Sequence, residues 1–267
     1  MPEPSAPVNE VVYSIGFERK ASLVPPRLGV ALTDLIEHYP STEVQQPYDM
    51  QLELPIEKQP TAVVAPGIDF LGVDQVNIRY WLISPDEVEV VQLQPNYLAT
   101  NWRRRRPDQA YPGYEALRQR FVETYAQINR AVLAQREEPI APRQVELTYV
   151  NILQPGSLWH RHGETHRVVR VQFEDVPDYE QLSFAYTRAL HWPHDGFAGR
   201  IYVTVQPAVD VGRHRPAINL TLTVRSAPLE PQTLQTALEF FEIAHTAITG
   251  AFRSITTEQA RRAWGLL

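Results

Sequence analysis

Three histidines in one short segment have a spacing that could hold a metal ion. The segment Trp159–His166 contains His160, His162 and His166, so a His-x-His pair is followed by a third histidine four residues later. Imidazole nitrogens at this spacing bind zinc and other divalent metals, which would suit a metal-dependent hydrolase or nuclease. The alternative is a solvated polar loop. Two arginines beside the histidines favour that alternative, because they would repel a cation.

Four consecutive arginines follow a tryptophan in the first half of the chain. The residues are Trp102, Arg103, Arg104, Arg105 and Arg106. Guanidinium groups pair with phosphates and an aromatic ring stacks on a base, so this run could sense a nucleotide or a nucleic acid. The same arginines also suit an acidic face of a protein partner. A run of charges can also be simply a solvated strand end. A protein partner fits at least as well as nucleic acid, because a net charge of −6 gives the chain no overall attraction for nucleic acid.

No pattern in the sequence indicates a catalytic nucleophile. Cysteine is absent, and lysine occurs only at Lys20 and Lys58. A thiolate, a zinc–cysteine site, a Schiff-base lysine and a phosphate-loop lysine are therefore not expected, and no Gly-x-Ser-x-Gly segment is present. His245 falls on the apolar stripe of a predicted helix, where we expect a hydrogen-bonded residue at the edge of the core. We predict no catalytic residue and no cofactor.

Composition places the chain among ordinary globular proteins. Its 267 residues are 43% hydrophobic and 21% charged, values that allow a sizeable core. No apolar run reaches the roughly 18 residues that a membrane span needs. The N-terminus is rich in proline and lacks a basic stretch followed by an apolar one, so no signal peptide is expected. We therefore expect a cytoplasmic protein without membrane contact.

Two hydrophobic periodicities alternate along the chain. Apolar residues at every second position predict strands, and spacings of three and four predict helices. In the first half the predicted strands are Asn9–Phe17, Val76–Ile83, Val88–Leu93 and Tyr97–Trp102, with Val44–Ile56 extended and helices at Leu28–Tyr39 and Tyr114–Val132. In the second half the predicted strands are Val145–Ile152, Val168–Phe173, Leu182–Leu190, Arg200–Gln206 and Ile218–Arg225, and the helix is Leu234–Phe252.

The same order of elements occurs twice, which suggests a duplicated module. The fold class predicted is α+β, with two similar halves. Each half would be an antiparallel sheet packed by a long C-terminal amphipathic helix. We place the halves at residues 1–137 and 138–267, with packing into one pseudo-symmetric domain as the alternative. Thr256 and Gln259 form a candidate capping box that would open a short last helix.

Several of these segments resemble a known family. The carriers are Glu10–Phe17, the meander with Tyr80 and Trp81, Tyr114 in the helix after Trp102, Leu147–Ile152, and His245–Phe252 followed by Ile255 and Thr256. They are similar to a conserved-hypothetical family of sporadically distributed bacterial and archaeal proteins that has no assigned activity. Such a distribution implies horizontally moved genes, often of toxin–antitoxin or phage-defence modules. The long loops of the second half depart from the family pattern.

We expect a non-catalytic protein-binding or chaperone-like component. Four tryptophans that look exposed in the sequence, Trp81, Trp102, Trp159 and Trp192, support this view because aromatic residues and arginines dominate interfaces. The partner would be another protein, and a homodimer is the default assembly. The alternatives are the metal-dependent hydrolase or nuclease and the nucleic-acid sensor.

Overall fold

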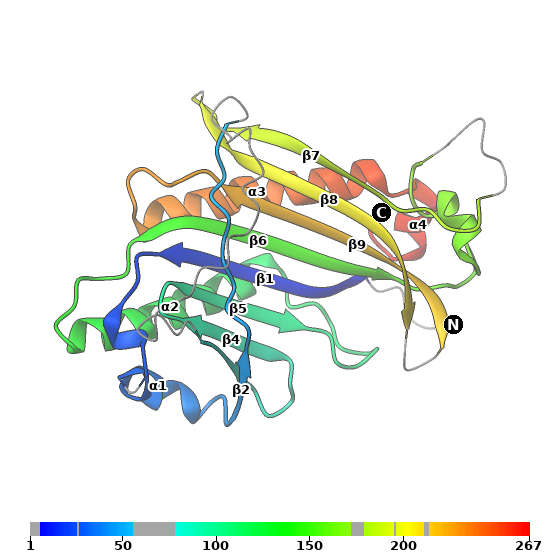
Figure 1. The fold of residues 1–267 in the computed structure, drawn as a ribbon. Coiled ribbons are helices and arrows are strands. Elements are labelled where there is room, and N and C mark those ends of the chain that lie inside the picture. Colours follow the sequence, from blue (N-terminus) through cyan, green and yellow to red (C-terminus); the bar gives the residue numbers. More distant parts are fainter. Residues whose placement is uncertain (1–5, 26, 56–77, 172–178, 195, 211–213) are drawn as a thin grey trace, which may run out of the picture.

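An antiparallel sheet forms the body of the molecule (Figure 1). The computed structural model describes residues 6–25, 27–55, 78–171, 179–194, 196–210 and 214–267. The strands are β1 (Val8–Phe17), β2 (Ser41–Gln45), β3 (Arg79–Ile83), β4 (Glu89–Gln94), β5 (Tyr97–Arg103), β6 (Pro142–Leu153), β7 (Phe184–His191), β8 (Phe197–Asp210) and β9 (Arg215–Ser226). The helices are α1 (Leu28–Ile36), α2 (Tyr114–Ala134), α3 (Leu234–Ile255) and α4 (Glu258–Ala263), with 3-10 turns η1 (Ala21–Leu23) and η4 (His162–Arg167).

The expectation of two halves with separate sheets is wrong. The nine strands form one sheet in the order β2-β3-β4-β5-β1-β6-β9-β8-β7. β1 pairs with β5 along one edge and with β6 along the other, where Tyr13 lies opposite Leu147. Strands from residues 1–137 and 138–267 are thereby joined. This pairing satisfies the backbone hydrogen bonds of two edges that separate sheets would leave open.

The two long helices cover one face of the sheet (Figure 1). Tyr13 of β1 lies between them, with its ring centroid 6.0 Å from that of Phe121 on α2 and 5.0 Å from that of Phe241 on α3. All three side chains are fully buried. α3 packs mainly on β6, β8 and β9, so it covers the second half only in part and β7 lies beyond it. One core therefore spans the junction of the two halves.

A segment of residues 46–55, here called the strap, crosses the other face of the sheet (Figure 1). The Tyr48 ring packs against Tyr97 at 5.0 Å between centroids, and the Tyr48 N–H donates to Oε1 of Gln94 at 3.0 Å. The hydroxyl of Tyr48 donates to Oε1 of Glu146 on β6 at 3.3 Å. The strap thus binds both parts of the sheet on either side of β1.

Glu53 anchors the far end of the strap. Its side chain is 3% exposed and accepts hydrogen bonds from Arg200 and from the hydroxyl of Tyr202, both on β8. Arg225 of β9 has Nη1 4.0 Å from Glu53 and Nη2 2.7 Å from Glu146. Burial, followed by the hydrogen bond to Glu53, raises the pKa of Tyr202 to about 12. The carboxylates and guanidinium groups neutralise one another under the strap.

Capping threonines explain where α3 and α4 begin, and two expectations need correction. Thr233 caps α3, because its side chain accepts from the Thr236 N–H at 3.1 Å. The cap of α4 is Thr257, one residue later than the capping box predicted at Thr256. The strand predicted from Val168 is also wrong within the described residues, where η4 is followed by an isolated bridge from Val169. Phe173 lies outside the described residues, as do Val76, Asn77 and Ile56.

Candidate functional site

Three arginines of the predicted run have partners on the protein surface. Arg103 ends β5 and donates from Nη2 to the Glu87 carbonyl at 3.1 Å. Arg105 donates from Nε to the same carbonyl at 3.1 Å and forms an ion pair with the Glu87 carboxylate at 3.2 Å. Arg106 forms a longer pair with Asp108, at 3.9 Å. Their charges are therefore partly compensated by neighbouring acidic and carbonyl groups.

Arg104 differs from its neighbours because its charge has no acidic partner among the described residues. Its backbone N–H donates to the Asn9 carbonyl at 2.7 Å, which fixes the start of β1 against the end of β5. The guanidinium carbon lies 6.0 Å from the ring centroid of Trp102. Nε and Nη2 are buried without a hydrogen-bond partner in the described structure. Burial with no nearby anion lowers the pKa of Arg104.

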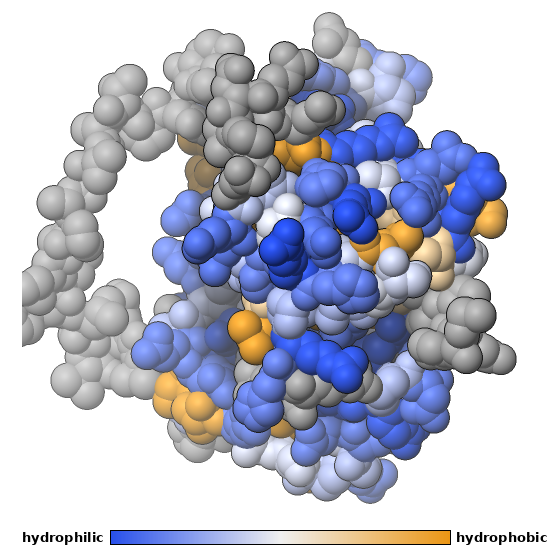
Figure 2. Space-filling view, turned by 90° about the vertical axis from the view of Figure 1, so that its right-hand side faces the viewer, coloured by the Kyte–Doolittle hydropathy of each residue, from blue (hydrophilic) through white to orange (hydrophobic). Residues whose placement is uncertain are grey.

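Arg104, Arg105 and Arg106 border a pocket of about 620 Å³ at one end of the sheet, here called the arginine pocket. Its walls come from the start of β1, the segment after β5, the end of β6 and the paired ends of β8 and β9. The described lining residues are Pro7, Asn9, Arg104, Arg105, Arg106, Pro107, Ile152, Gln154, Ala208, Val209, Asp210 and Ala217. Figure 2 views the molecule from this end of the sheet, where most of the described surface is hydrophilic. Guanidinium and amide groups of this kind can hold a carboxylate or a phosphate.

The tryptophan of the run is not available to a ligand. Trp102 is 3% exposed and packs edge-on against Tyr111, with 5.6 Å between the ring centroids. Trp159 is also buried, at 1% exposure, and Trp81 and Trp192 are half-buried. The expectation of four exposed tryptophans is therefore wrong. The base-stacking role predicted for Trp102 has no accessible ring.

The three histidines are near one another in sequence but do not share a metal site. Nε2 of His162 lies 3.1 Å from the Ala208 carbonyl and 2.9 Å from the Ala217 carbonyl, so this nitrogen carries hydrogen and holds the β8–β9 hairpin. His160 is exposed, and Nδ1 of His166 lies 3.3 Å from the Tyr179 hydroxyl. Within the described ranges, no three His, Asp or Glu side chains come together to hold a metal ion.

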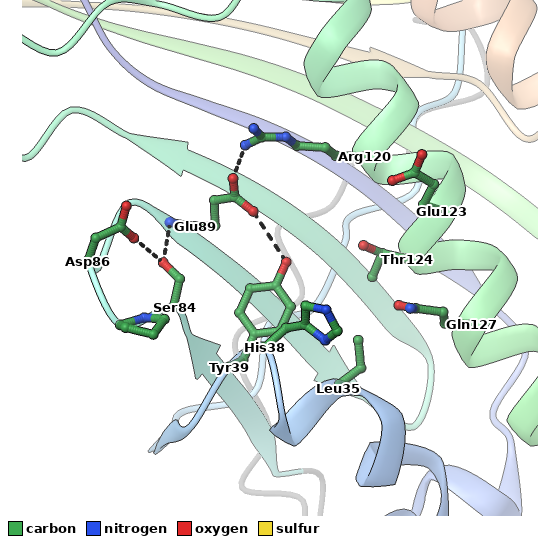
Figure 3. Close-up of a pocket in the computed structure, with 11 residues that line it drawn as sticks. Leu35, His38, Tyr39, Ser84, Asp86, Glu89, Arg120, Glu123, Thr124 and Gln127 are labelled. Atoms are coloured by element: carbon green, nitrogen blue, oxygen red, sulfur yellow. Dashed lines mark hydrogen bonds and ion pairs between the residues drawn. The ribbon is translucent and has the colours of Figure 1, made fainter.

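A second pocket, of about 640 Å³, lies between α1, the β3–β4 turn and α2 (Figure 3). Glu89 accepts hydrogen bonds from the Tyr39 hydroxyl at 3.4 Å and from Arg120. Asp86 accepts from the Ser84 hydroxyl at 2.7 Å, and this hydrogen bond is the main cause of its lowered pKa. Glu89, Arg120 and Asp86 thus have partners within the pocket. It is a weaker candidate for an ionic ligand than the arginine pocket.

Sequence patterns identified the arginines of the arginine pocket but none of its other lining residues. Asn9, Gln154 and Asp210 come from three distant segments and carry no motif. His162 holds the paired ends of β8 and β9 at the pocket through the carbonyls of Ala208 and Ala217, which lie 46 and 55 residues after it in the sequence. A local pattern contains no signal of this contact.

Comparisons with known proteins give no indication of function, so function is argued from the geometry of the site. No family model matches this chain, and no curated protein matches it. The resemblance to an uncharacterised family therefore stays a prediction. Among the helices of the described ranges, none combines the length and apolarity needed to span a membrane.

Proposed function

We propose that this protein is a non-catalytic binding protein that holds an acidic segment of a protein partner in the arginine pocket. The observation that carries the proposal is Arg104, a half-buried guanidinium with no acidic partner at the wall of a 620 Å³ pocket. Partial burial of the Arg104 charge without an anion costs free energy, and an incoming carboxylate would offset that charge. An anion in the pocket would reach the guanidinium through Nη1, because the other two nitrogens are enclosed by protein.

The lining of the pocket favours binding over chemistry. Its described side chains are arginines, amides, one carboxylate and small apolar groups, with no serine, threonine, tyrosine or histidine among them. Asn9 and Gln154 can donate to an oxygen anion, and Ile152 and Val209 can contact the aliphatic part of a peptide. Such a mixture suits an extended acidic peptide segment better than a reaction that needs a nucleophile.

A protein partner suits the pocket better than nucleic acid. A nucleic acid presents many phosphates, whereas Arg105 and Arg106 already face Glu87 and Asp108. Trp102 is buried and offers no ring for a base. The net charge of −6 also opposes a polyanion. A segment with few carboxylates matches the uncompensated charge of Arg104.

The test is calorimetric titration of the whole chain with a short peptide that carries two glutamates and with a matched peptide that has two glutamines in their place. We expect the glutamate peptide to bind and Arg104→Gln to weaken that binding about tenfold or more, as for a lost charged hydrogen bond. Arg262→Gln is the control, because this exposed arginine pairs with Glu258 on α4, outside the pocket. Equal binding of both peptides, or no effect of Arg104→Gln, would contradict the proposal.

A single-stranded oligonucleotide is the second ligand in the same experiment. Tight binding that weakens steeply with salt would favour the nucleic-acid sensor instead. Binding of the peptide alone would support the protein partner.

A further inference from the structure

In the described part of the chain, β7 is the last strand of the sheet and has a free edge and a run of exposed side chains. β7 pairs with β8 from Phe184 opposite Val205 to Leu190 opposite Gly199. On its other edge the described structure has no strand. Five consecutive residues of β7, Ala185–Ala189, are exposed, although Ile201 and Val203 beside them on β8 are fully buried. Burial therefore stops between β8 and β7, because α3 packs mainly on β6, β8 and β9.

β7 has few of the features by which proteins usually protect an edge strand. Natural edges carry charged side chains, proline, bulges or very short strands, which prevent pairing with another chain, and Arg188 is the only Lys, Arg, Asp or Glu in β7. β7 has eight residues, contains no proline and no lysine, and its irregularity with β8 lies only at its end, between Leu190 and His191. Within the described residues, Phe184–Leu190 thus form a regular edge that pairs with no further strand.

The sequence of β7 is complementary to itself when it runs antiparallel about Thr187. In this register Tyr186 lies opposite Arg188 of the second copy, and the symmetric pair repeats the contact. Ala185 lies opposite Ala189, and Phe184 opposite Leu190. The exposed pairs match a cation with an aromatic ring and a small residue with a small one, whereas Leu190 is already buried within its own copy.

Other registers are poorer. Centring the pair on Arg188 would set the two Arg188 side chains against each other, which is destabilising. Centring it on Tyr186 would shorten the overlap to Phe184–Arg188. Thr187 is the centre that uses the whole regular part of the strand and separates the charges.

We infer that two copies of this chain associate through β7, which continues the sheet across a two-fold axis at Thr187. The occupant of the edge is a second copy, because the complementarity described above is between β7 and itself. A two-fold contact of this kind also closes, since neither copy is left with a free β7 edge. This assembly is independent of the arginine pocket, which lies on other elements.

A single cysteine at the axis tests both the dimer and its register. The natural chain has no cysteine, so Thr187→Cys would be the sole thiol. Facing residues of antiparallel strands have Cα atoms about 4.5–5.5 Å apart, within the range that a disulfide spans. We expect this variant to form a covalent dimer under mild oxidation. Ala185→Cys is the matched control, because its two copies would lie about 14 Å apart along the strands and should not cross-link.

Sedimentation of the uncross-linked protein gives the second measurement. We expect the natural chain to be a dimer at micromolar concentration, and Tyr186→Arg to weaken association about tenfold by placing two cations together. Adding Arg188→Glu to that variant should restore the dimer through a new ion pair. Circular dichroism of each variant checks that the fold is kept, which is expected because both side chains are exposed. A monomeric natural chain, or cross-linking of Ala185→Cys as readily as Thr187→Cys, would overturn the inference.

Discussion

His245 stands on α3 with its imidazole stacked on the ring of Tyr114, at 3.9 Å between centroids and 4° between planes. The position agrees with a residue at the edge of the core. Burial lowers the pKa of His245, and the weaker fields of Glu242 and Glu115 act in the opposite direction. Within the folded protein the imidazole therefore prefers the neutral form.

This preference makes stability depend on pH. The unfolded chain binds a proton at His245 more readily than the folded one, so the contribution of His245 to stability is present above the unfolded pKa, near 6.5, and is lost as the pH falls towards the folded pKa. His245→Phe keeps a ring against Tyr114 and cannot take up the proton. We expect urea unfolding at pH 5 and pH 7.5 to show a smaller loss of stability on acidification for the variant. An equal loss in both proteins would contradict this account.

Gly199 and Gly250 differ in whether the structure has room for a side chain at their positions. Gly199 on β8 has φ +153°, and a Cβ atom there would lie 2.1 Å from the Arg225 carbonyl oxygen of β9. Gly250 on α3 has open space around the position of a Cβ atom. We expect Gly199→Ala to cost about 2 kcal/mol or more of unfolding free energy through backbone strain. Gly250→Ala should instead add about 0.5–1 kcal/mol through helix propensity.

Chemical denaturation of the two variants measures both effects with the same substitution. A stable Gly199→Ala protein would show that β8 and β9 can separate at this point without loss. A loss of stability in Gly250→Ala would mean that the helix tolerates no side chain there.

Elements with one buried face could be predicted from the sequence. β9 has alternating apolar and polar residues, and α3 has its apolar residues at spacings of three and four, because one side of each element faces the core. The strand and helix bounds of this kind agree with the prediction within a few residues. Pairing of β1 with β6 could not be predicted, because the alternation of a strand does not specify which strand lies beside it.

The residues of the candidate site could be predicted in part, but their surroundings could not. Arg104 was among the predicted binding residues, because four arginines in a row are visible in the sequence. Its distinctive property, burial without an acidic partner in the described part of the chain, depends on the start of β1 and on Trp102. The burial of Trp102 by Tyr111 is likewise a tertiary contact, so the sequence pattern could not separate an exposed ring from a buried one.

At the scale of the whole molecule, the strap is held by a buried carboxylate. Removing the charge of Glu53 would leave Arg200, whose side chain is 11% exposed, without its anion. Breaking one partner of a buried ion pair costs roughly 3–5 kcal/mol, so Glu53→Gln should lower the free energy of unfolding by about 3 kcal/mol. Amide exchange across residues 46–55 should rise in the same variant, because the strap loses its anchor.

Glu239→Gln is the control for this experiment. Glu239 is exposed on α3 and accepts a hydrogen bond from Gln235, so its substitution should change stability by about 0.5 kcal/mol or less. Equal effects of the two substitutions would mean that the network beneath the strap does not hold it to the sheet.

The contacts of the strap also determine how late in synthesis it can bind to the sheet. Glu53 is made early on the ribosome, but Arg200 and Tyr202 follow 147 and 149 residues later. Until Arg200 and Tyr202 leave the ribosome, Glu53 cannot form these two contacts. Until β6 is made, one edge of β1 has no partner strand. Contacts between such distant residues form late in folding, after their loops close. The strap can therefore bind fully to the sheet only after β8 has been made. A fragment that ends before β6 would expose one edge of β1 and the carboxylate of Glu53.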